Sequence, residues 1–317
     1  MVQGVGSALP SSSVDNATLA RTKNLDTSDD WIVPRTGIKQ RFIASTDETT
    51  STLAIAAANA ALTNAGITAQ DIQLIIVATS TPDKVFPPCA TLVQGALGAH
   101  KAIALDINVA CSGFVFGMAM AESYMRMSGY THALLIGAET MSRIVDWSDR
   151  STAVLFGDGA GAVVLSAHTN TKRGLQGHAL FTDGRHDHSL YVDGGIGSTA
   201  SAGHIRMNGK AVFRHAVTQL ENATRCLLDT HDLTVDDIDW VIPHQANKRI
   251  LESMCTHLGF PSEKMIFTGN HHANTSAASI PLAWDRAHTQ GQLAPGHRII
   301  IQSFGAGFTW GAYLIVV

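Results

Sequence analysis

Charge is scarce in this sequence of 317 residues. Charged side chains make up 15% of the chain, against about 25% in an average globular protein. The net charge is −4, whereas a general nucleic-acid binder carries a marked basic excess. Hydrophobic residues make up 45% of the chain, which excludes a disordered protein. With so little charge available for its surface, we expect the protein to bury part of that surface in a subunit interface.

Targeting and metal-binding motifs are also missing. The first basic residue is Arg21 and no run of 18 apolar residues occurs, so we expect no signal peptide, no membrane span and a cytoplasmic protein. The cysteines form no CxxC pair and the 15 histidines form no HExxH motif. These absences disfavour disulfides and a zinc site, and we expect neither a metal nor another cofactor.

Three signatures of common catalytic classes are absent as well. The chain has no GxGxxG or GxxxxGK[ST] sequence and no GxSxG nucleophile elbow. Nucleotide-driven chemistry and serine hydrolysis therefore lose support. Two other glycine runs, 156–162 and 304–311, have flexible spacing. Backbone amides of the second run could form part of an oxyanion hole.

What the sequence does contain is an alternation of short apolar runs and helical stretches, which predicts an α/β protein. The helical stretches are Leu53–Asn64, Phe114–Met127 and Phe213–Asp229. Residues 168–211 are rich in Gly, His, Ser and Asp and predict long loops. The expected buried strands are Ile72–Ala78, Ala102–Ile107, Ala133–Gly137, Ala162–Ala167, Trp240–Pro243, Arg298–Gln302 and Gly311–Val317.

Two parts of the chain resemble each other. GITAQDIQLIIVATS (66–80) is similar to DLTVDDIDWVIPHQA (232–246), with Asp71 matching Asp237, and HALLIGAET (132–140) is similar to HRIIIQSFG (297–305). The nearly equal offsets suggest a duplicated βαβ-rich unit, with halves at 1–170 and 171–317. The alternative is that any two buried strands look alike.

Three residues are candidates for catalysis. Cys111 lies between an expected strand and an expected helix, where the helix N-terminus favours the nucleophilic thiolate; we therefore expect its pKa to lie below the ordinary value of about 8.5. The alternative is a small buried hydrophobe. His244 follows a strand at the sheet edge, where α/β sites form, although it could be a capping or core histidine. Asn274 lies in a loop that enters a helix and could donate its amide to an oxygen.

Six segments resemble blocks of the β-ketoacyl-acyl-carrier-protein synthase III family. ACSGF, VIPHQAN and GNHHANTSAAS surround the three candidates and look like the active-site motifs of that family. DTSDDWIVPRTGIKQR (26–41), DRSTAVLFGDGAGAVVL (149–165) and SFGAGFTWG (303–311) look like further blocks. The resemblance implies a thiolase-like fold, two duplicated βαβ-rich halves in a five-layer α-β-α-β-α arrangement, and a homodimer.

The resemblance also implies an activity, namely the decarboxylative condensation of a short acyl-CoA, such as acetyl-CoA, with malonyl-acyl-carrier protein. This reaction initiates fatty-acid synthesis. Cys111 would carry the acyl group, while His244 and Asn274 would donate hydrogen bonds to the enolate. Phe304, Gly305 and Gly307 would support the oxyanion site. Alternatives are a related condensing enzyme or acyltransferase of specialised metabolism, and a non-catalytic acyl-CoA binder.

Roles in binding follow from the same resemblance. Phe86 would close the acyl pocket of the partner subunit. Three positions depart from the family pattern. Ala306 and Ser151 each stand where the family often has glycine, and Pro34 stands where threonine is common. The implied docking patch for the acidic carrier protein is Arg214, Lys248 and Arg249, and the implied coenzyme A contacts are Thr27, Trp31, Arg35, Arg150, Phe213 and Asn247.

Overall fold

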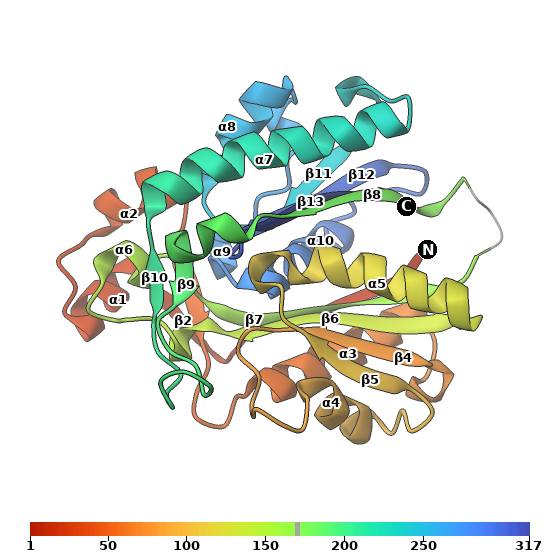
Figure 1. Ribbon diagram of the computed structural model, residues 1–317, viewed down its shortest axis with the longest axis horizontal. Helices are drawn as coiled ribbons and strands as arrows, with labels where there is room; N and C mark the ends of the chain where they lie inside the picture. The colour runs from red at the N-terminus through yellow and green to blue at the C-terminus, as the bar shows by residue number, and fades with distance from the viewer. Residues whose placement is uncertain (169–171) are drawn as a thin grey trace.

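Two stacked β-sheets organise the chain, with helices outside and between them (Figure 1). The computed structural model describes residues 1–168 and 172–317. Within them, one sheet has the strand order β1-β7-β6-β4-β5 and the other has the order β11-β12-β13-β8. The strands of the first sheet are β1 (Val2–Ala8), β4 (Leu74–Ala78), β5 (Ile103–Ile107), β6 (His132–Thr140) and β7 (Asp158–Ser166); those of the second are β8 (Gly174–Thr182), β11 (Trp240–Pro243), β12 (Arg298–Gly305) and β13 (Thr309–Val316).

The helices complete five layers (Figure 1). α3 (Thr50–Ala65) and α4 (Cys89–Leu97) cover the outer face of the first sheet, and α7 (Gly209–Thr230) and α8 (Lys248–Leu258) lie outside the second. α5 (Gly113–Ser128) and α10 (Ser279–Thr289) form the layer between the sheets. The remaining elements are α1 (Asn16–Lys23), α2 (Asp29–Thr36), α6 (Arg150–Ala153), α9 (Gly269–His272), β2 (Ser12–Asp15), β3 (Gln40–Ile43), β9 (Leu190–Val192) and β10 (Ile205–Met207).

The two sheets repeat one topology, which confirms the predicted duplication. In the first sheet, β4 pairs parallel with β6, and β6 pairs antiparallel with β7. In the second sheet, β11 pairs parallel with β12, and β12 pairs antiparallel with β13 in the same way. The turn before each parallel strand is closed by the same capping box, Thr68 with Asp71 and Thr234 with Asp237. The predicted boundary at 170/171 lies outside the described residues.

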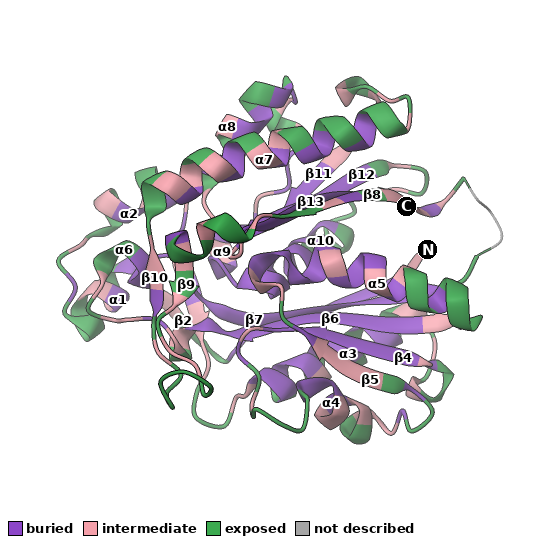
Figure 2. Ribbon diagram, viewed as in Figure 1, coloured by how far each residue is buried: buried purple, intermediate pink, exposed green. Residues whose placement is uncertain are grey.

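Small residues let the central layer approach the first sheet closely. A Cβ atom on Gly137 of β6 would lie 2.3 Å from the carbonyl oxygen of Ala277, and one on Gly161 of β7 would lie 2.7 Å from Cβ of Pro281. Every residue of β7 is buried. The run 156–162 therefore lies largely in a packed strand. Strands covered on both faces leave little room for charge, and Figure 2 shows β6 and β7 buried along most of their length.

The prediction of long loops over 168–211 was wrong for much of this segment, although a loop does span 193–204. The segment holds β8, which pairs antiparallel with β13, and the ribbon of β9 and β10. β8 lies at the edge of its sheet and only two of its nine residues are buried, so its sequence lacks the continuous apolar run by which the other strands were found. No helix within the described residues is long and apolar enough to cross a bilayer.

Candidate active site

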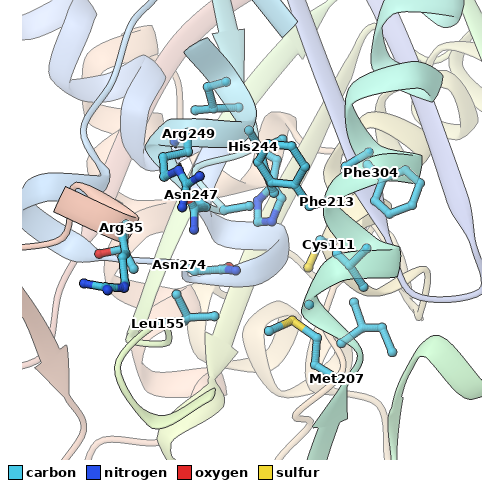
Figure 3. A pocket seen from close by; sticks show the side chains of 18 of the residues that line it. Arg35, Cys111, Leu155, Met207, Phe213, His244, Asn247, Arg249, Asn274 and Phe304 are labelled. Carbon is cyan, nitrogen blue, oxygen red and sulfur yellow. Dashed lines mark hydrogen bonds between the residues drawn. The ribbon is translucent and has the colours of Figure 1, made fainter. Parts of the chain in front are cut away.

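A cavity of about 600 Å³ opens between the two halves and is lined by side chains from both (Figure 3). Cys111 comes from the first half, whereas His244, Asn274 and Phe304 come from the second. Several residues expected to bind coenzyme A or the carrier protein also line the cavity, namely Trp31, Arg35, Phe213, Asn247 and Arg249. Residues that are individually weak candidates thus line one space.

Cys111 lies in a tight turn that leads directly into α5. The residue before it, Ala110, has a φ of 45°, a left-handed conformation that strains a residue with a side chain. The turn is fixed to the second half by Ser303 Oγ, which donates to the carbonyl of Cys111 at 2.7 Å, and by Ser112 Oγ, which donates to the carbonyl of Thr309 at 2.9 Å. The nucleophile is therefore held by contacts between halves.

The expected low pKa of Cys111 is contradicted by its burial. Only 8% of the residue is exposed, and burial raises the pKa of the thiol to about 12, with a further rise from the Glu139 carboxylate. Hydrogen bonds from the Ser276 side chain and from the amide of Cys111 itself lower the pKa, but by less. The position before a helix was predicted correctly; the loss of solvent around the sulfur was not. Cys111 is a thiol at neutral pH.

His244 follows β11 and is held as a neutral hydrogen-bond donor. Its Nδ1 lies 2.6 Å from Ser279 Oγ, which also accepts the backbone N–H of Gln245 at 3.2 Å. Since the Ser279 hydroxyl has no other acceptor among the described residues, we assign its proton to the bond with Nδ1, which places the ring proton on Nε2. Nε2 is buried without a partner, and burial lowers the pKa of His244 to about 3.

Asn274 completes the three predicted residues. Its Oδ1 accepts the backbone N–H of Ser276 at 2.9 Å, so that its amide nitrogen remains as a donor. The neighbouring His271 and His272 do not line the cavity. His272 is 2% exposed, and burial lowers its pKa to about 3. The geometry therefore favours Asn274 over either histidine as the third cavity residue.

Two arginines lie over the indole of Trp31. The guanidinium carbon of Arg35 is 4.5 Å from the ring centroid, and that of Arg150 is 4.7 Å. Arg150 also donates to the carbonyl of Asp26 at 2.6 Å. A base inserted between Trp31 and Arg150 needs about 7 Å, two van der Waals contacts of about 3.5 Å each. The expected adenine slot is closed in this structure, and Arg150 has to move to open it. Thr27 does not line the cavity.

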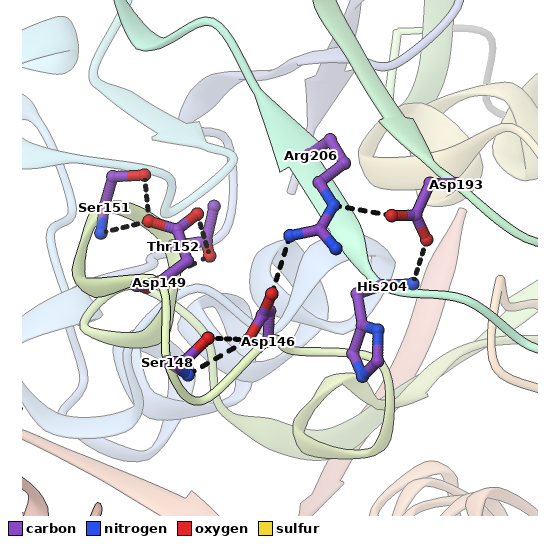
Figure 4. A network of polar contacts seen from close by, with 8 residues as sticks. All are labelled: Asp146, Ser148, Asp149, Ser151, Thr152, Asp193, His204 and Arg206. Atoms are coloured by element: carbon purple, nitrogen blue, oxygen red, sulfur yellow. Dashed lines mark hydrogen bonds and ion pairs between the residues drawn. The ribbon is translucent and has the colours of Figure 1, made fainter. Parts of the chain in front are cut away.

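An ion-pair network holds the segment that carries Arg150 (Figure 4). Arg206 of β10 donates to Asp146 through Nη1 and to Asp193 through Nε, each at 2.6 Å. The Ser148 hydroxyl and, to a smaller extent, the Arg206 guanidinium hold the pKa of Asp146 well below its usual range. Arg206 was missed in the sequence because its partners lie far from it in the chain, and no motif connects them.

The C-terminal end of β12 approaches Cys111 closely. A Cβ on Gly305 would lie 3.0 Å from the amide nitrogen of Cys111, and Gly307 in the following turn has a φ of 134°, which favours glycine. The Phe304 ring is buried against Phe308, with ring centroids 4.7 Å apart. Glycine at position 305 therefore keeps a side chain out of the space beside the Cys111 amide.

Of the residues predicted for carrier-protein docking and for the acyl pocket, only Arg249 lines the cavity. Arg214 and Lys248 are exposed, and Lys248 pairs with Glu252 at 3.1 Å. Arg249 is exposed and reaches the cavity. Phe86 is 81% exposed and does not line the cavity of its own chain.

Sequence reasoning also missed buried residues that support the site. Ser279, Ser303 and Ser276 position His244, Cys111 and Asn274. Serines are too common to be singled out, although an acid within the apolar run 132–140 was a usable signal for the buried Glu139.

Together, the duplicated five-layer fold and the cysteine–histidine–asparagine cavity define a thiolase-like condensing enzyme, a kind of acyltransferase. Models of 3-oxoacyl-[acyl-carrier-protein] synthase III and of its C-terminal region match residues 105–184 and 228–317. The β-ketoacyl-[acyl-carrier-protein] synthase III of Rhizorhabdus wittichii is 55% identical over 99% of this chain and 98% of its own. The chain belongs to the β-ketoacyl-[acyl-carrier-protein] synthase III family, as its motifs predicted.

Solved structures agree with this assignment. The 3-oxoacyl-[acyl-carrier-protein] synthase III of Aquifex aeolicus is 40% identical, with a TM-score of 0.94 over 100% of this chain and 99% of its own. The priming β-ketosynthase of a polyketide pathway is 34% identical, also with a TM-score of 0.94, over 100% of this chain and 95% of its own.

Proposed function

We propose that this enzyme joins an acetyl group from acetyl-CoA to malonyl-acyl-carrier protein, with Cys111 as the acyl carrier, in the initiating condensation of fatty-acid synthesis. The observation that carries the proposal is the cavity in which Cys111, His244 and Asn274 meet. Cysteine is the only one of the three that can form a thioester. The two neutral donors suit a reaction in which negative charge develops on an oxygen.

Acylation comes first. The Cys111 thiol loses its proton as its sulfur attacks the thioester carbonyl and the carbonyl oxygen becomes an oxyanion. The carbon–sulfur bond to coenzyme A then breaks, and the coenzyme A sulfur leaves with the electron pair and takes up a proton, so that one thiol is exchanged for another. The amide of Cys111, next to Gly305, is the donor we assign to that oxyanion, with support from Gly307 and Phe304. A preorganised donor of this kind is worth about 10²–10³ in rate.

Condensation follows on the acylated enzyme. The malonyl carboxylate departs as carbon dioxide, and its bond electrons form a thioester enolate, whose oxygen accepts hydrogen bonds from His244 Nε2–H and the Asn274 amide. The enolate carbon then attacks the acyl-Cys111 carbonyl and releases the cysteine. Because the pKa of His244 lies near 3, it acts as a donor, and decarboxylation needs no base.

The cavity also suits a coenzyme A substrate. We assign the pantetheine arm to the wall that includes Phe213 and Asn247, and the adenine to Trp31 with Arg35 and Arg150. Thr27 remains a proposed contact of the nucleotide. Arg150 has to swing off the indole first, which breaks a contact worth about 0.5–1 kcal/mol at an exposed site.

We assign carrier-protein docking to Arg249, with Arg214 as a second cation. Both are exposed, and Arg249 also reaches the cavity through which the carrier's prosthetic arm would enter. Lys248 contributes less, because Glu252 already neutralises it. Basic groups at such a rim mainly accelerate encounter with an acidic partner.

The quaternary arrangement is proposed on the basis of exposed apolar residues. Phe86 and Val85 are 81% and 69% exposed, and β5 ends its sheet with an unpaired edge. A homodimer that covers this edge would bring Phe86 to the partner's acyl pocket, where its size favours a short primer. We further propose that the enzyme is cytoplasmic, because Cys111 has to stay reduced to react. We also propose that the boundary between its two halves lies near residue 170.

The test is purified protein with acetyl-CoA and malonyl-acyl-carrier protein. We expect a β-ketoacyl product and one acetyl label on the peptide that contains Cys111. Cys111→Ala should abolish both, whereas Cys226→Ser, a change at an exposed cysteine, should preserve both. Absence of the label on wild-type protein would refute the proposal, and a much faster reaction with long or aromatic acyl-CoA would favour a specialised condensing enzyme.

A further inference from the structure

The Arg206 network joins two segments that are far apart in the chain (Figure 4). From β10, the guanidinium donates to Asp146, which precedes α6, and to Asp193, which follows β9, each at 2.6 Å. The side chains of all three are between 22% and 37% exposed. A single ion pair with this exposure contributes little to stability, whereas charges that form a network hold one geometry. Arg206 therefore fixes Asp146 relative to the hairpin of β9 and β10.

The residues between Asp146 and Arg150 pass this constraint along the chain. Asp146 accepts the backbone N–H of Ser148 at 3.0 Å and the Ser148 hydroxyl at 2.6 Å. The carbonyl of Asp146 accepts the backbone N–H of Asp149 at 3.0 Å, and Asp149 in turn caps α6 by accepting the N–H of Ser151 at 2.8 Å. Arg150 is the first residue of that helix. Its backbone is thus fixed by a continuous set of hydrogen bonds that begins at the network.

A backbone hydrogen bond also ties this part of the chain to β10. The N–H of Ile205 donates to the carbonyl of Ile144 at 2.9 Å, and α6 packs against β10. This bond does not involve the side chain of Arg206. A substitution at Arg206 should therefore loosen the stretch from Asp146 to Arg150 without detaching it from the hairpin, so that the variant still folds.

The expected slot for a base opens through Arg150. Its guanidinium carbon lies 4.7 Å from the ring centroid of Trp31, whereas an inserted base needs about 7 Å. With its backbone held, Arg150 can open the slot by rotating its side chain and can close it again over the base. If the backbone were loose, binding would also have to order it. Ordering the backbone of one residue weakens binding by about fivefold to thirtyfold.

We propose that Arg206 is a positioning residue for the nucleotide of coenzyme A. Through Asp146 it holds the backbone of Arg150, so that one side chain opens and closes the slot. Arg206 itself does not line the cavity and acts through Arg150. The inference rests on the proposed coenzyme A substrate and makes Arg206 specific for thioesters that carry a nucleotide, because a thioester on the carrier protein has no base to place in the slot.

Two other roles for Arg206 predict different results. If Arg206 attracted the anionic nucleotide directly, removal of a neighbouring negative charge at Asp146 would tighten binding, whereas positioning predicts that it weakens binding. The network has one cation and two carboxylates, which already argues against attraction. If Arg206 only supported the cavity wall through the adjacent Met207, which lines the cavity, its removal would weaken every substrate alike.

The first experiment titrates coenzyme A itself into the intact enzyme and measures the dissociation constant by calorimetry. Arg206→Gln and Asp146→Asn should each raise this constant about tenfold, and Arg206→Lys, which retains the charge, should raise it less. In an Arg150→Ala background, Arg206→Gln should have no further effect, because the residue through which it acts is already missing.

The second experiment separates nucleotide binding from the rest of the reaction. For Arg206→Gln we expect KM for acetyl-CoA to rise about tenfold with kcat within twofold of wild type. The rate at which acetyl-pantetheine, which lacks the nucleotide, acetylates Cys111 should stay within twofold, as should KM for malonyl-acyl-carrier protein. Arg225→Gln is the matched control: this arginine of α7 pairs with Glu221 at 3.0 Å and donates to the carbonyl of His257 at 2.9 Å. It should leave every value within twofold.

The outcomes distinguish this inference from the proposed function. Wild-type enzyme that binds coenzyme A but forms no product would refute the condensation and leave the inference standing. The inference would be overturned by wild-type enzyme that does not bind coenzyme A, by Arg206→Gln that binds it within twofold of wild type, or by Asp146→Asn that binds it more tightly. Additive losses with Arg150→Ala, or an equal loss with acetyl-pantetheine, would overturn it as well.

Discussion

His272 is a neutral imidazole inside the protein, and this makes folding sensitive to acid. It is 2% exposed, and burial, with smaller effects of His271 and Arg286, lowers its pKa from 6.5 to about 3. Below pH 6.5 the unfolded chain binds a proton at this position while the folded protein does not. Stability from this residue is thus complete above pH 6.5 and is lost as the pH falls toward 3.

The size of the loss follows from the two pKa values. Each pH unit well inside this interval removes about 1.36 kcal/mol. At pH 6.5 the unfolded-state histidine is only half protonated, so lowering the pH from 6.5 to 4.5 costs about 2.3 kcal/mol through His272 alone. His272→Gln removes this titration and leaves the other titrating groups unchanged. The difference in unfolding free energy between wild type and variant should therefore change by about 2.3 kcal/mol across this range, in favour of the variant at pH 4.5.

Urea unfolding at a fixed protein concentration, at pH 6.5, 5.5 and 4.5, measures that difference. Fixed concentration matters because the proposed subunit association would contribute to the apparent stability. His288→Gln changes an exposed histidine of α10 and should run parallel to wild type. If the His272→Gln curve also ran parallel to wild type, the account of a buried neutral imidazole would be refuted.

Three further predictions concern catalysis. Trp31→Ala should raise KM for acetyl-CoA about tenfold with kcat changed by less than twofold, because the indole contacts only the nucleotide; a lower kcat in steady-state assays would contradict this. Arg249→Glu should raise KM for malonyl-acyl-carrier protein but not for acetyl-CoA, and the effect should shrink in high salt; equal effects on both substrates would argue against docking. Asn274→Ala should keep acetyl labelling of Cys111 but slow malonyl decarboxylation about 100- to 1000-fold, as followed by carbon dioxide release; lost labelling would place Asn274 in the first step instead.

The placement of the cavity residues could be foreseen from sequence, because it depends on local pattern. Cys111 and His244 each follow an apolar strand, and the edges of the two duplicated sheets bring such positions together. Asn274 was harder to predict, since two histidines stand beside it and only the fold shows which side chain lines the cavity.

Protonation states could not be foreseen in the same way. The helix after Cys111 was visible in the sequence, but the burial that raises its pKa arises from chain segments nearly 200 residues away, such as Ser303. The closed contact between Arg150 and Trp31 likewise depends on a distant loop. Propensity and spacing describe neighbours along the chain, whereas desolvation depends on neighbours in space.

The division of the site between two halves has a consequence for the newly made chain. Ser303 of the second half anchors Cys111. The Cys111 thiol therefore meets His244 and Asn274 only after the second half has folded onto the first. At about 5–20 residues per second, on the order of ten to thirty seconds separate synthesis of the cysteine from that of the asparagine. During this interval the ribosome-bound chain holds a thiol without a decarboxylation site, so malonyl groups are safe from wasteful loss until the enzyme is complete.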